Sequence, residues 1–321
     1  MLVSYAQNFE DLVLERIFHD QASGFYIDVG AGDPVNDSVT HLFHARGWRG
    51  ISIEPDRRLF ARLAAARPRD VNLNIAVGER AETRRFFELS VPGLSSLDAE
   101  CAAMAAERGA VATETTVAVE TLAEICRRHA DAPIDFLKVD VEGWERQVLA
   151  SNDWRRFRPK IVLVEATRPN TTVPSHEAWE RLLLEEGYLF ACFDGLNRFY
   201  VDAAHGGLVP ILAAPPRFLA DGAVLHREIL MRRRAEASEQ QAELLARQAG
   251  EAERIRQAAE ARAEAAVQRA AEAAEIRYAA EARAAEAERR AIAAERAHAD
   301  WARSPIGRLA RFLRLHRRRE L

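Results

Sequence analysis

The chain has 321 residues, 48% of them hydrophobic, which is enough for one large α/β domain with an extension or for two domains. The net charge of −4 hides an acidic body and a basic end, because residues 301–321 carry seven arginines and one glutamate. Three cysteines, an odd number without CxxC spacing, argue against a disulfide framework or a cysteine zinc site and indicate a reducing compartment.

The N-terminal stretch MLVSYAQNFEDLVLERIF carries acidic residues where a signal peptide needs basic ones. No stretch of the sequence approaches the roughly 20 consecutive apolar residues of a membrane-spanning helix. We therefore expect a cytoplasmic protein, with the basic end as a candidate contact to the inner face of the membrane.

Short β-branched runs alternate with helical patterns over residues 1–205. Repeated strand–helix crossovers force parallel pairing, so they predict a doubly wound α/β sheet with helices on both faces. Between the third and fourth strands, an insertion at 82–120 predicts two edge strands around a small alanine-rich helix. We predict strands at 25–29, 50–54, 71–77, 134–140, 160–165, 188–193 and 197–201, and helices at 8–19, 37–46, 56–67, 121–130, 143–150 and 175–186.

The last two predicted strands are joined by Asp194-Gly195, a dipeptide that favours a tight hairpin turn. A parallel sheet finished by an antiparallel hairpin is the arrangement of class I S-adenosylmethionine-dependent methyltransferases. Nicotinamide-binding Rossmann domains normally continue with parallel strands. The hairpin therefore favours a Rossmann-like methyltransferase sheet over the dinucleotide-binding type.

The first predicted strand runs into a loop that starts with Asp28 and holds Gly30 and Gly32. Glycines at the carboxyl end of a parallel strand let a ligand lie against bare backbone. The dinucleotide fingerprint GxGxxG needs a third glycine, but this chain has Val35, and Pro34 removes one backbone amide. The loop thus argues against a pyrophosphate and against an NAD-dependent oxidoreductase.

A carboxylate, Glu54, ends the second strand 24 residues after Gly30. This is where such folds place the acidic residue that accepts both ribose hydroxyls of a nucleoside. Asp28 is a candidate partner for the amine of an amino-acid-bearing cofactor, because opposite charges attract strongly in a partly dry cleft. The loop, Glu54 and the hairpin together predict S-adenosylmethionine as the cofactor.

The segment LKVDVEGWE places Lys138, Asp140 and Glu142 at alternate positions around the end of the fourth strand, so they point to one side if extended. Glu165 ends the adjacent fifth strand. Clustered carboxylates repel one another, which raises the pKa of at least one and makes it a candidate general base. The same three carboxylates are the candidate ligands if a hard cation such as Mg²⁺ binds. Both interpretations stay open.

Two further residues are candidates outside these strands. His176, on the predicted rim after the fifth strand, is a candidate base for catalysis. Gln7 lies in an N-terminal segment that can fold over the cofactor. An ordinary amphipathic first helix is the alternative interpretation of that segment.

The first two-thirds of the chain contain an ordered series of motifs: SYAQNFEDLVLERIF, GFYIDVGAGDP, GWRGISIEPD, NLNIAVGE, IDFLKVDVEGWE, PKIVLVEATRP, SHEAWERLLLEEGY and FDGLNRFYV. In this order they resemble the FkbM-type methyltransferase family. The resemblance implies S-adenosylmethionine-dependent O-methylation, commonly of a sugar or natural-product hydroxyl.

By this resemblance, Asp28, Gly30 and Gly32 form the cofactor loop, Glu54 binds the ribose and the segment around Ala76 flanks the adenine. The sequence departs from the family at Trp144, where members often carry a small residue after the glycine of the DVEG motif. This tryptophan either alters helix packing or narrows the acceptor site.

Composition changes near residue 230, and residues 235–300 contain 27 alanines among 66 residues, without proline. High helix propensity and absent breakers predict a long helix at 231–300, joined by a linker at 206–230 to a methyltransferase domain at 1–205. The large apolar residues of this helix do not keep a seven-residue repeat. Self-association as a coiled coil and a solvated single helix therefore both remain open.

The basic segment 301–321 interleaves arginines with apolar residues, which suits a short amphipathic helix on an anionic membrane surface or an acidic partner. We do not expect nucleic acid as a partner. The acceptor is expected to be a small molecule or glycan. A non-catalytic scaffold with a degenerate methyltransferase domain is the alternative function.

Overall fold

The computed structural model describes residues 2–90, 95–107, 109–168, 171–215 and 222–310. The chain divides into two compact units, Met1–Ala235 and Glu236–Leu321. In the described part, no helix has the length and apolar character that a membrane span requires. Residues 311–321, half of the predicted basic segment, lie outside the described residues.

A seven-stranded sheet forms the centre of the first unit, in the order β10-β11-β9-β8-β2-β3-β4. β2 pairs in parallel with β3 and β8, and the parallel pairing continues from β3 to β4 and from β8 to β9. β11 runs antiparallel to both β9 and β10, which makes the predicted hairpin. The strands are β2 (Phe25–Val29), β3 (Arg49–Ile53), β4 (Val71–Leu73), β8 (Phe136–Val139), β9 (Ile161–Glu165), β10 (Tyr188–Phe193) and β11 (Asn197–Asp202).

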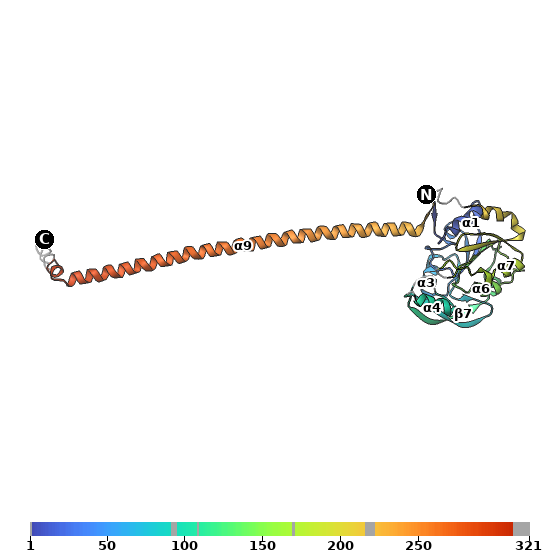
Figure 1. The fold of residues 1–321 in the computed structure, drawn as a ribbon, viewed down its shortest axis with the longest axis horizontal. Helices are drawn as coiled ribbons and strands as arrows, with labels where there is room; N and C mark the ends of the chain where they lie inside the picture. The colour runs from blue at the N-terminus through green and yellow to red at the C-terminus, as the bar shows by residue number, and fades with distance from the viewer. Residues whose placement is uncertain (1, 91–94, 108, 169–170, 216–221, 311–321) are drawn as a thin grey trace. The chain divides into compact units, whose positions relative to one another are not determined.

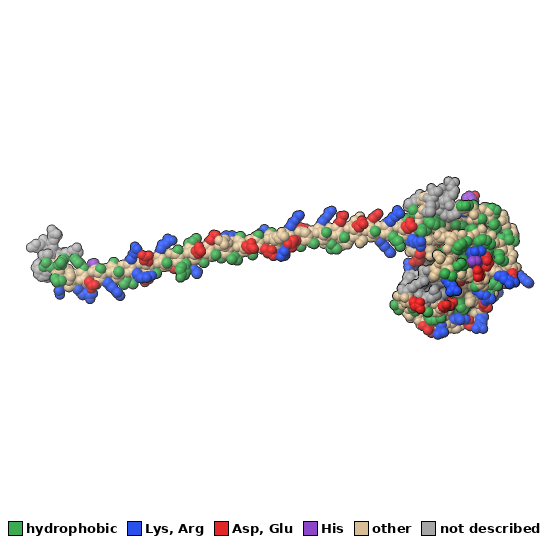
Figure 2. All heavy atoms as spheres, viewed as in Figure 1, with side chains coloured by type: hydrophobic (Ala, Val, Ile, Leu, Met, Phe, Trp, Pro, Cys, Tyr) green, Lys and Arg blue, Asp and Glu red, His purple; other side chains and the backbone are tan. Residues whose placement is uncertain are grey.

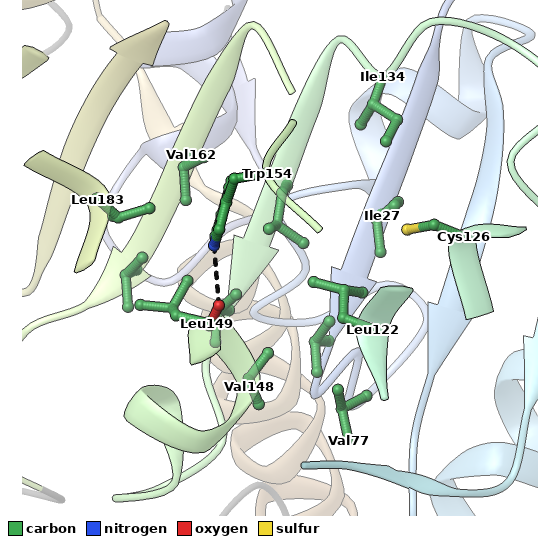
Figure 3. Packing of buried hydrophobic residues seen from close by; sticks show 14 of the residues in the cluster. Ile27, Val77, Leu122, Cys126, Ile134, Val148, Leu149, Trp154, Val162 and Leu183 are labelled. Carbon is green, nitrogen blue, oxygen red and sulfur yellow. Dashed lines mark hydrogen bonds between the residues drawn. The ribbon is translucent and has the colours of Figure 1, made fainter. Parts of the chain in front are cut away.

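Helices cover both faces of this sheet, and all five residues of β2 are accordingly buried. Ile27 packs into an apolar cluster with residues of α5 (Leu122–His129), α6 (Glu145–Ala150) and α7 (Glu180–Glu185). Figure 3 shows this cluster, in which the indole nitrogen of Trp154 donates to the carbonyl of Leu149 at 3.0 Å. The predicted α/β fold with a mostly parallel sheet is confirmed.

The opposite face of the sheet carries an aromatic cluster. Tyr26 of β2 packs there with residues of α1 (Glu10–Phe18), α2 (His41–Ala45) and α8 (Val209–Ala213). Residues 209–213, predicted as linker, are therefore part of this layer. The remaining helices of the unit include α3 (Arg57–Ala66) and the short helices His176–Ala178 and Ala203–Leu208.

The insertion forms a second sheet in the order β5-β7-β6, which confirms its two predicted strands. It holds β5 (Ala76–Val77), β6 (Glu82–Leu89) and β7 (Ala112–Glu120), with α4 (Ala99–Glu107) between the last two. The strand predicted at 71–77 is thus two strands in two sheets. Asn74 lies at the break, where its side-chain amide donates to the carbonyls of Glu54 and Pro55, both at 2.9 Å.

The C-terminal helix, α9 (His226–Arg303), is a single continuous helix (Figure 1), so the predicted long helix is confirmed with a start five residues earlier. Basic and acidic side chains are interspersed along it (Figure 2). Several form i,i+4 ion pairs, such as Arg290 with Glu286 at 2.6 Å. Such exposed pairs each add only a few tenths of a kcal/mol to helix stability.

The aromatic cluster generates a stability prediction at Phe136, which is fully buried against the rings of Tyr26, Phe43 and Trp48 at centroid distances of 5.7, 5.1 and 6.2 Å. Phe136→Ala removes these contacts and leaves a cavity, so we expect the free energy of unfolding to fall by about 3–5 kcal/mol. Urea titration measures this change. Phe193→Ala, at a side chain that is 48% exposed, should cost much less. Equal losses in the two variants would contradict the assigned core.

Candidate functional site

A cavity of about 980 Å³ lies at the carboxyl ends of β2, β3, β8 and β9. Open α/β sheets bind their ligands at this edge. The lining includes most of the predicted site residues: Gln7, Gly30, Gly32, Glu54, Ala76, Lys138, Asp140, Glu142 and Glu165.

The loop after β2 is fixed by close approach to neighbouring strand ends. The amides of Gly30 and Ala31 donate to the carbonyl of Ile53, at 3.0 and 3.1 Å. Gly30 has a φ of 77°, and a Cβ there would lie 1.8 Å from the carbonyl oxygen of Asp140. Gly32 also has positive φ, at 63°, but a Cβ there would meet open space. Gly30 is thus required by packing, whereas Gly32 presents bare backbone at the cavity.

Glu54 links this loop to the end of β3. Its carboxylate accepts from the amide of Gly32 and from the amide of Asp56, both at 2.8 Å. The side chain is 5% exposed, and burial raises the pKa of Glu54 to about 7. A ligand that donates hydrogen bonds to this carboxylate would stabilise its charged form.

Lys138 connects the loop to the end of β8. Its ammonium group donates to the carbonyl of Gly30 at 2.6 Å and lies 3.4 Å from Asp28 and 3.3 Å from Asp140. Burial disfavours the charge of Lys138, but the carboxylates of Asp140 and Asp28 outweigh burial and raise the pKa of Lys138 above its ordinary value. The lysine is therefore charged and held in place, which makes it a positioning group.

Asp28 lies next to Lys138 and not among the described residues that line the cavity. Its carboxylate is buried, accepts from the hydroxyl of Thr40 at 2.7 Å and pairs with Lys138. It lies outside the described lining of the cavity. The structure thus places Asp28 against Lys138 and outside the described lining, and its contact with a cofactor amine stays a prediction.

Three carboxylates converge in the cavity near the carboxyl ends of β8 and β9. Oxygen atoms of Asp140, Glu142 and Glu165 all lie within 4.8 Å of one another. Within the described residues, one oxygen of Glu142 and one of Glu165 are buried without a hydrogen-bond partner. Burial, followed by repulsion from Asp140, raises the pKa of both glutamates well above the ordinary value. A proton or a cation among the three carboxylates would relieve this repulsion.

The backbone that carries Glu142 is strained. Glu142 has a φ of 53°, a left-handed conformation that only a few per cent of non-glycine residues adopt. Its carbonyl accepts from the hydroxyl of Ser96 at 2.8 Å, and its loop is capped by Glu145, whose carboxylate accepts from the amide of Gly143 at 3.0 Å. Burial raises the pKa of Glu145 to about 7. Such strain persists where surrounding contacts enforce it, commonly at functional sites.

Sequence reasoning missed Glu145, although an acidic residue in the first turn of a helix was a usable signal. It also missed five serine and threonine residues of the cavity lining, because they come from the insertion and from the loop after β9. These are Ser95, Ser96, Thr167, Thr171 and Thr172.

Trp144 lines the cavity, and the guanidinium of Arg84 lies 4.7 Å from its ring centroid. The structure thus places Trp144 at the cavity, and its effect on the acceptor stays a prediction. His176 lies outside the described lining, and its nearest charged partner is Glu180 at 3.9 Å. The structure does not bring His176 to the carboxylate trio.

Residues 28–190 match the family described as the methyltransferase FkbM domain. The match covers 163 of the 321 residues, and the chain belongs to this family. Membership implies methyltransferase activity, and the resemblance drawn from the motifs is confirmed. A search of curated proteins gives no match.

The loop geometry yields a prediction at Gly30. Gly30→Ala combines positive φ with overlap against Asp140, so we expect unfolding free energy to fall by about 2–5 kcal/mol. Gly195→Ala is the matched control, because Gly195 has a φ of 103° but open space around a Cβ. It should cost only the backbone strain, about 1–2 kcal/mol. Urea titration compares the two, and equal losses would argue against the close approach of the loop to β8.

Proposed function

We propose that the protein transfers a methyl group from S-adenosylmethionine to a hydroxyl of a carbohydrate, glycoconjugate or natural product. The observation that carries this proposal is the buried carboxylate of Glu54, set beside the bare backbone of Gly32 in the cavity. Family membership supplies the reaction class, and the cavity supports the cofactor and acceptor.

The residues present fit an adenosyl group. Glu54 offers carboxylate oxygens to the ribose hydroxyls, and Ala76 lines the cavity at the start of the second sheet, where the adenine would lie. Pro34 and Val35 stand where a dinucleotide loop needs an amide and a glycine. The loop therefore supports a nucleoside without a pyrophosphate.

The sheet supports the same cofactor over NAD. Its order places the antiparallel hairpin at one edge, beside β9, as in class I methyltransferases. A nicotinamide-dependent oxidoreductase would continue the parallel series there. The finer assignment to a class I Rossmann-like methyltransferase fold is thus part of this proposal.

The bound S-adenosylmethionine would supply an electrophilic methyl group. The chain must then orient the acceptor hydroxyl and receive its proton. We assign the proton to the trio of Asp140, Glu142 and Glu165, in which burial raises the pKa of the two glutamates. Lys138 holds Asp140 in place from below, at 3.3 Å. A positioned base of this kind typically contributes about 10²- to 10⁴-fold in rate.

A hard divalent cation is the alternative occupant of the trio. Carboxylate oxygens are the ligands that Mg²⁺ prefers, and a bound cation would acidify the acceptor hydroxyl. Because both mechanisms use the same three side chains, substitutions do not distinguish them. Removal of metal ions by a chelator does, since only the cation mechanism depends on a metal.

The lining also restricts the acceptor. Its carboxylates, including Asp33 and Asp37, outnumber its two basic residues, Arg62 and Lys138. Arg62 is paired with Asp33 at 2.5 Å. Repulsion therefore disfavours anionic acceptors, whereas the threonine and serine hydroxyls suit a neutral polyhydroxylated one.

The scaffold alternative assigns the function to the C-terminal helix α9, here called the arm. Across residues 231–284, every side chain of α9 is exposed, which leaves the surface free for self-association or another partner. If the arm alone carried the function, Glu54→Gln would leave cellular function intact and removal of residues 236–321 would abolish it. The methyltransferase proposal expects loss with Glu54→Gln.

We expect calorimetric titration to detect S-adenosylmethionine binding to the wild-type protein. Glu54→Gln should weaken binding by about 10- to 100-fold, because it removes the charge that strengthens hydrogen bonds from the ribose. A urea titration of the variant checks its fold, since glutamine can accept from only one of the two backbone amides that Glu54 accepts from. Glu79→Gln, at a half-exposed side chain, is the control. No binding heat for the wild type, or equal affinity in Glu54→Gln, would contradict the proposal.

We expect Glu165→Gln to lower kcat by about 10²- to 10⁴-fold while S-adenosylmethionine affinity stays within a few-fold. In the wild type, kcat should fall as pH drops through the raised pKa values of Glu142 and Glu165, because protonation removes the base. A screen of neutral glycans with methyl-labelled cofactor measures both effects. Insensitivity to EDTA supports the base, whereas loss in EDTA with rescue by Mg²⁺ supports the cation. An unchanged rate in Glu165→Gln would refute both.

A further inference from the structure

The start of the C-terminal helix packs on the loop that follows β2, although it lies outside the matched family segment. β12 (Val224–Leu225), just before α9, pairs in parallel with β1 (Val3–Ser4). The amide of Val224 also donates to the carbonyl of Leu2 at 2.9 Å. Leu225 is buried, at 7% exposed. The pairing of β12 with β1 therefore fixes the position at which α9 begins.

The first two residues of α9 contact two residues of the cavity lining. His226 Nδ1 lies 3.2 Å from the side-chain oxygen of Asn36, and the guanidinium of Arg227 donates to Asp37 at 3.1 Å. Asn36 and Asp37 both line the cavity. Asp37 has a φ of 57°, so these contacts hold a residue in an unfavourable backbone conformation.

Tyr5 ties the same elements together from the N-terminal side. Its ring lies 4.3 Å from the ring of His41 and 4.9 Å from that of His226, measured between centroids. Its carbonyl accepts from the amide of Ser38 at 2.8 Å. The segment leads directly to Gln7, which lines the cavity. The N-terminal segment and the helix start therefore form one wall beside the loop.

Burial marks where this wall ends. His226, Arg227, Ile229 and Leu230 are half-buried, whereas every side chain across residues 231–284 is exposed. We call residues 223–230 the helix root.

We propose that the helix root is part of the cofactor site, and that His226 and Arg227 are positioning residues for Asn36 and Asp37. This rests on the proposed function, because the affinity concerned is that for S-adenosylmethionine. A domain cut at the end of the family match would lose these contacts. Since linkage is reciprocal, cofactor binding in turn stabilises the root.

The expected effects are moderate. Arg227 and Asp37 are 38% and 50% exposed, and ion pairs of this kind are weak. Loss of this pair alone should weaken cofactor binding by about two- to five-fold. Loss of the His226 contact as well should bring the reduction to about ten-fold.

The test uses the full chain and calorimetric titration with S-adenosylmethionine. We expect H226A/R227A to raise the Kd for the cofactor by about ten-fold and its KM in proportion, with kcat unchanged. R232A/R233A, two exposed residues of the same helix beyond the root, is the matched control and should bind like the wild type. Arg227→Lys should recover most of the affinity that Arg227→Gln loses.

A double-mutant cycle separates positioning from folding. If Arg227 acts through Asp37, Arg227→Gln should have little further effect in an Asp37→Asn background. The thermal midpoint without cofactor should stay unchanged in the Arg227→Gln variant. Wild-type affinity in H226A/R227A, or additive losses in the cycle, would overturn the inference. Absence of binding in the wild type would instead refute the proposed function.

Discussion

The site depends on one buried ammonium group, that of Lys138. It bonds the carbonyl of Gly30 at the end of β2 and pairs with Asp28 below and Asp140 beside it. Breaking a buried pair from one side typically costs about 3–5 kcal/mol, since it strands the partner charge. The lysine therefore fixes the glycine loop and the acidic end of β8 relative to each other. It adds to the backbone pairing of β2 with β8, which holds the same two sides of the cavity together.

Negative charge dominates the cavity that Lys138 organises, and this excess connects the proposed cofactor, base and acceptor. Burial raises the pKa of Glu54, Glu142 and Glu165, so each carboxylate gains when a ligand supplies hydrogen-bond donors or positive charge. A sulfonium cofactor would supply the positive charge, and a neutral polyol would supply the hydrogen-bond donors. Glu142 and Asp37, which both line the cavity, have left-handed backbone conformations. Such strained residues are commonly found at functional sites, where surrounding contacts enforce them.

The sequence predicted the strands, the glycine loop and Glu54, because these depend on local patterns and on the edge where parallel strands end. It did not predict that Asp28 pairs with Lys138 and lies outside the described lining of the cavity, since the two residues are 110 positions apart in the sequence. The break at Asn74 was also hidden, because it arises from bonds to a neighbouring strand. Contacts of Arg227 with the loop after β2 join residues 190 positions apart, and alanine-rich helix composition gives no sign of them.

The central claim is that Glu54 and the backbone at Gly32 bind the adenosyl group. A crystal structure of the full chain with S-adenosylhomocysteine tests it most directly. The account predicts density for the ligand in the cavity, with both ribose hydroxyls within hydrogen-bond distance of the Glu54 carboxylate. Density for the ligand elsewhere, or an empty cavity at a saturating ligand concentration, would contradict it.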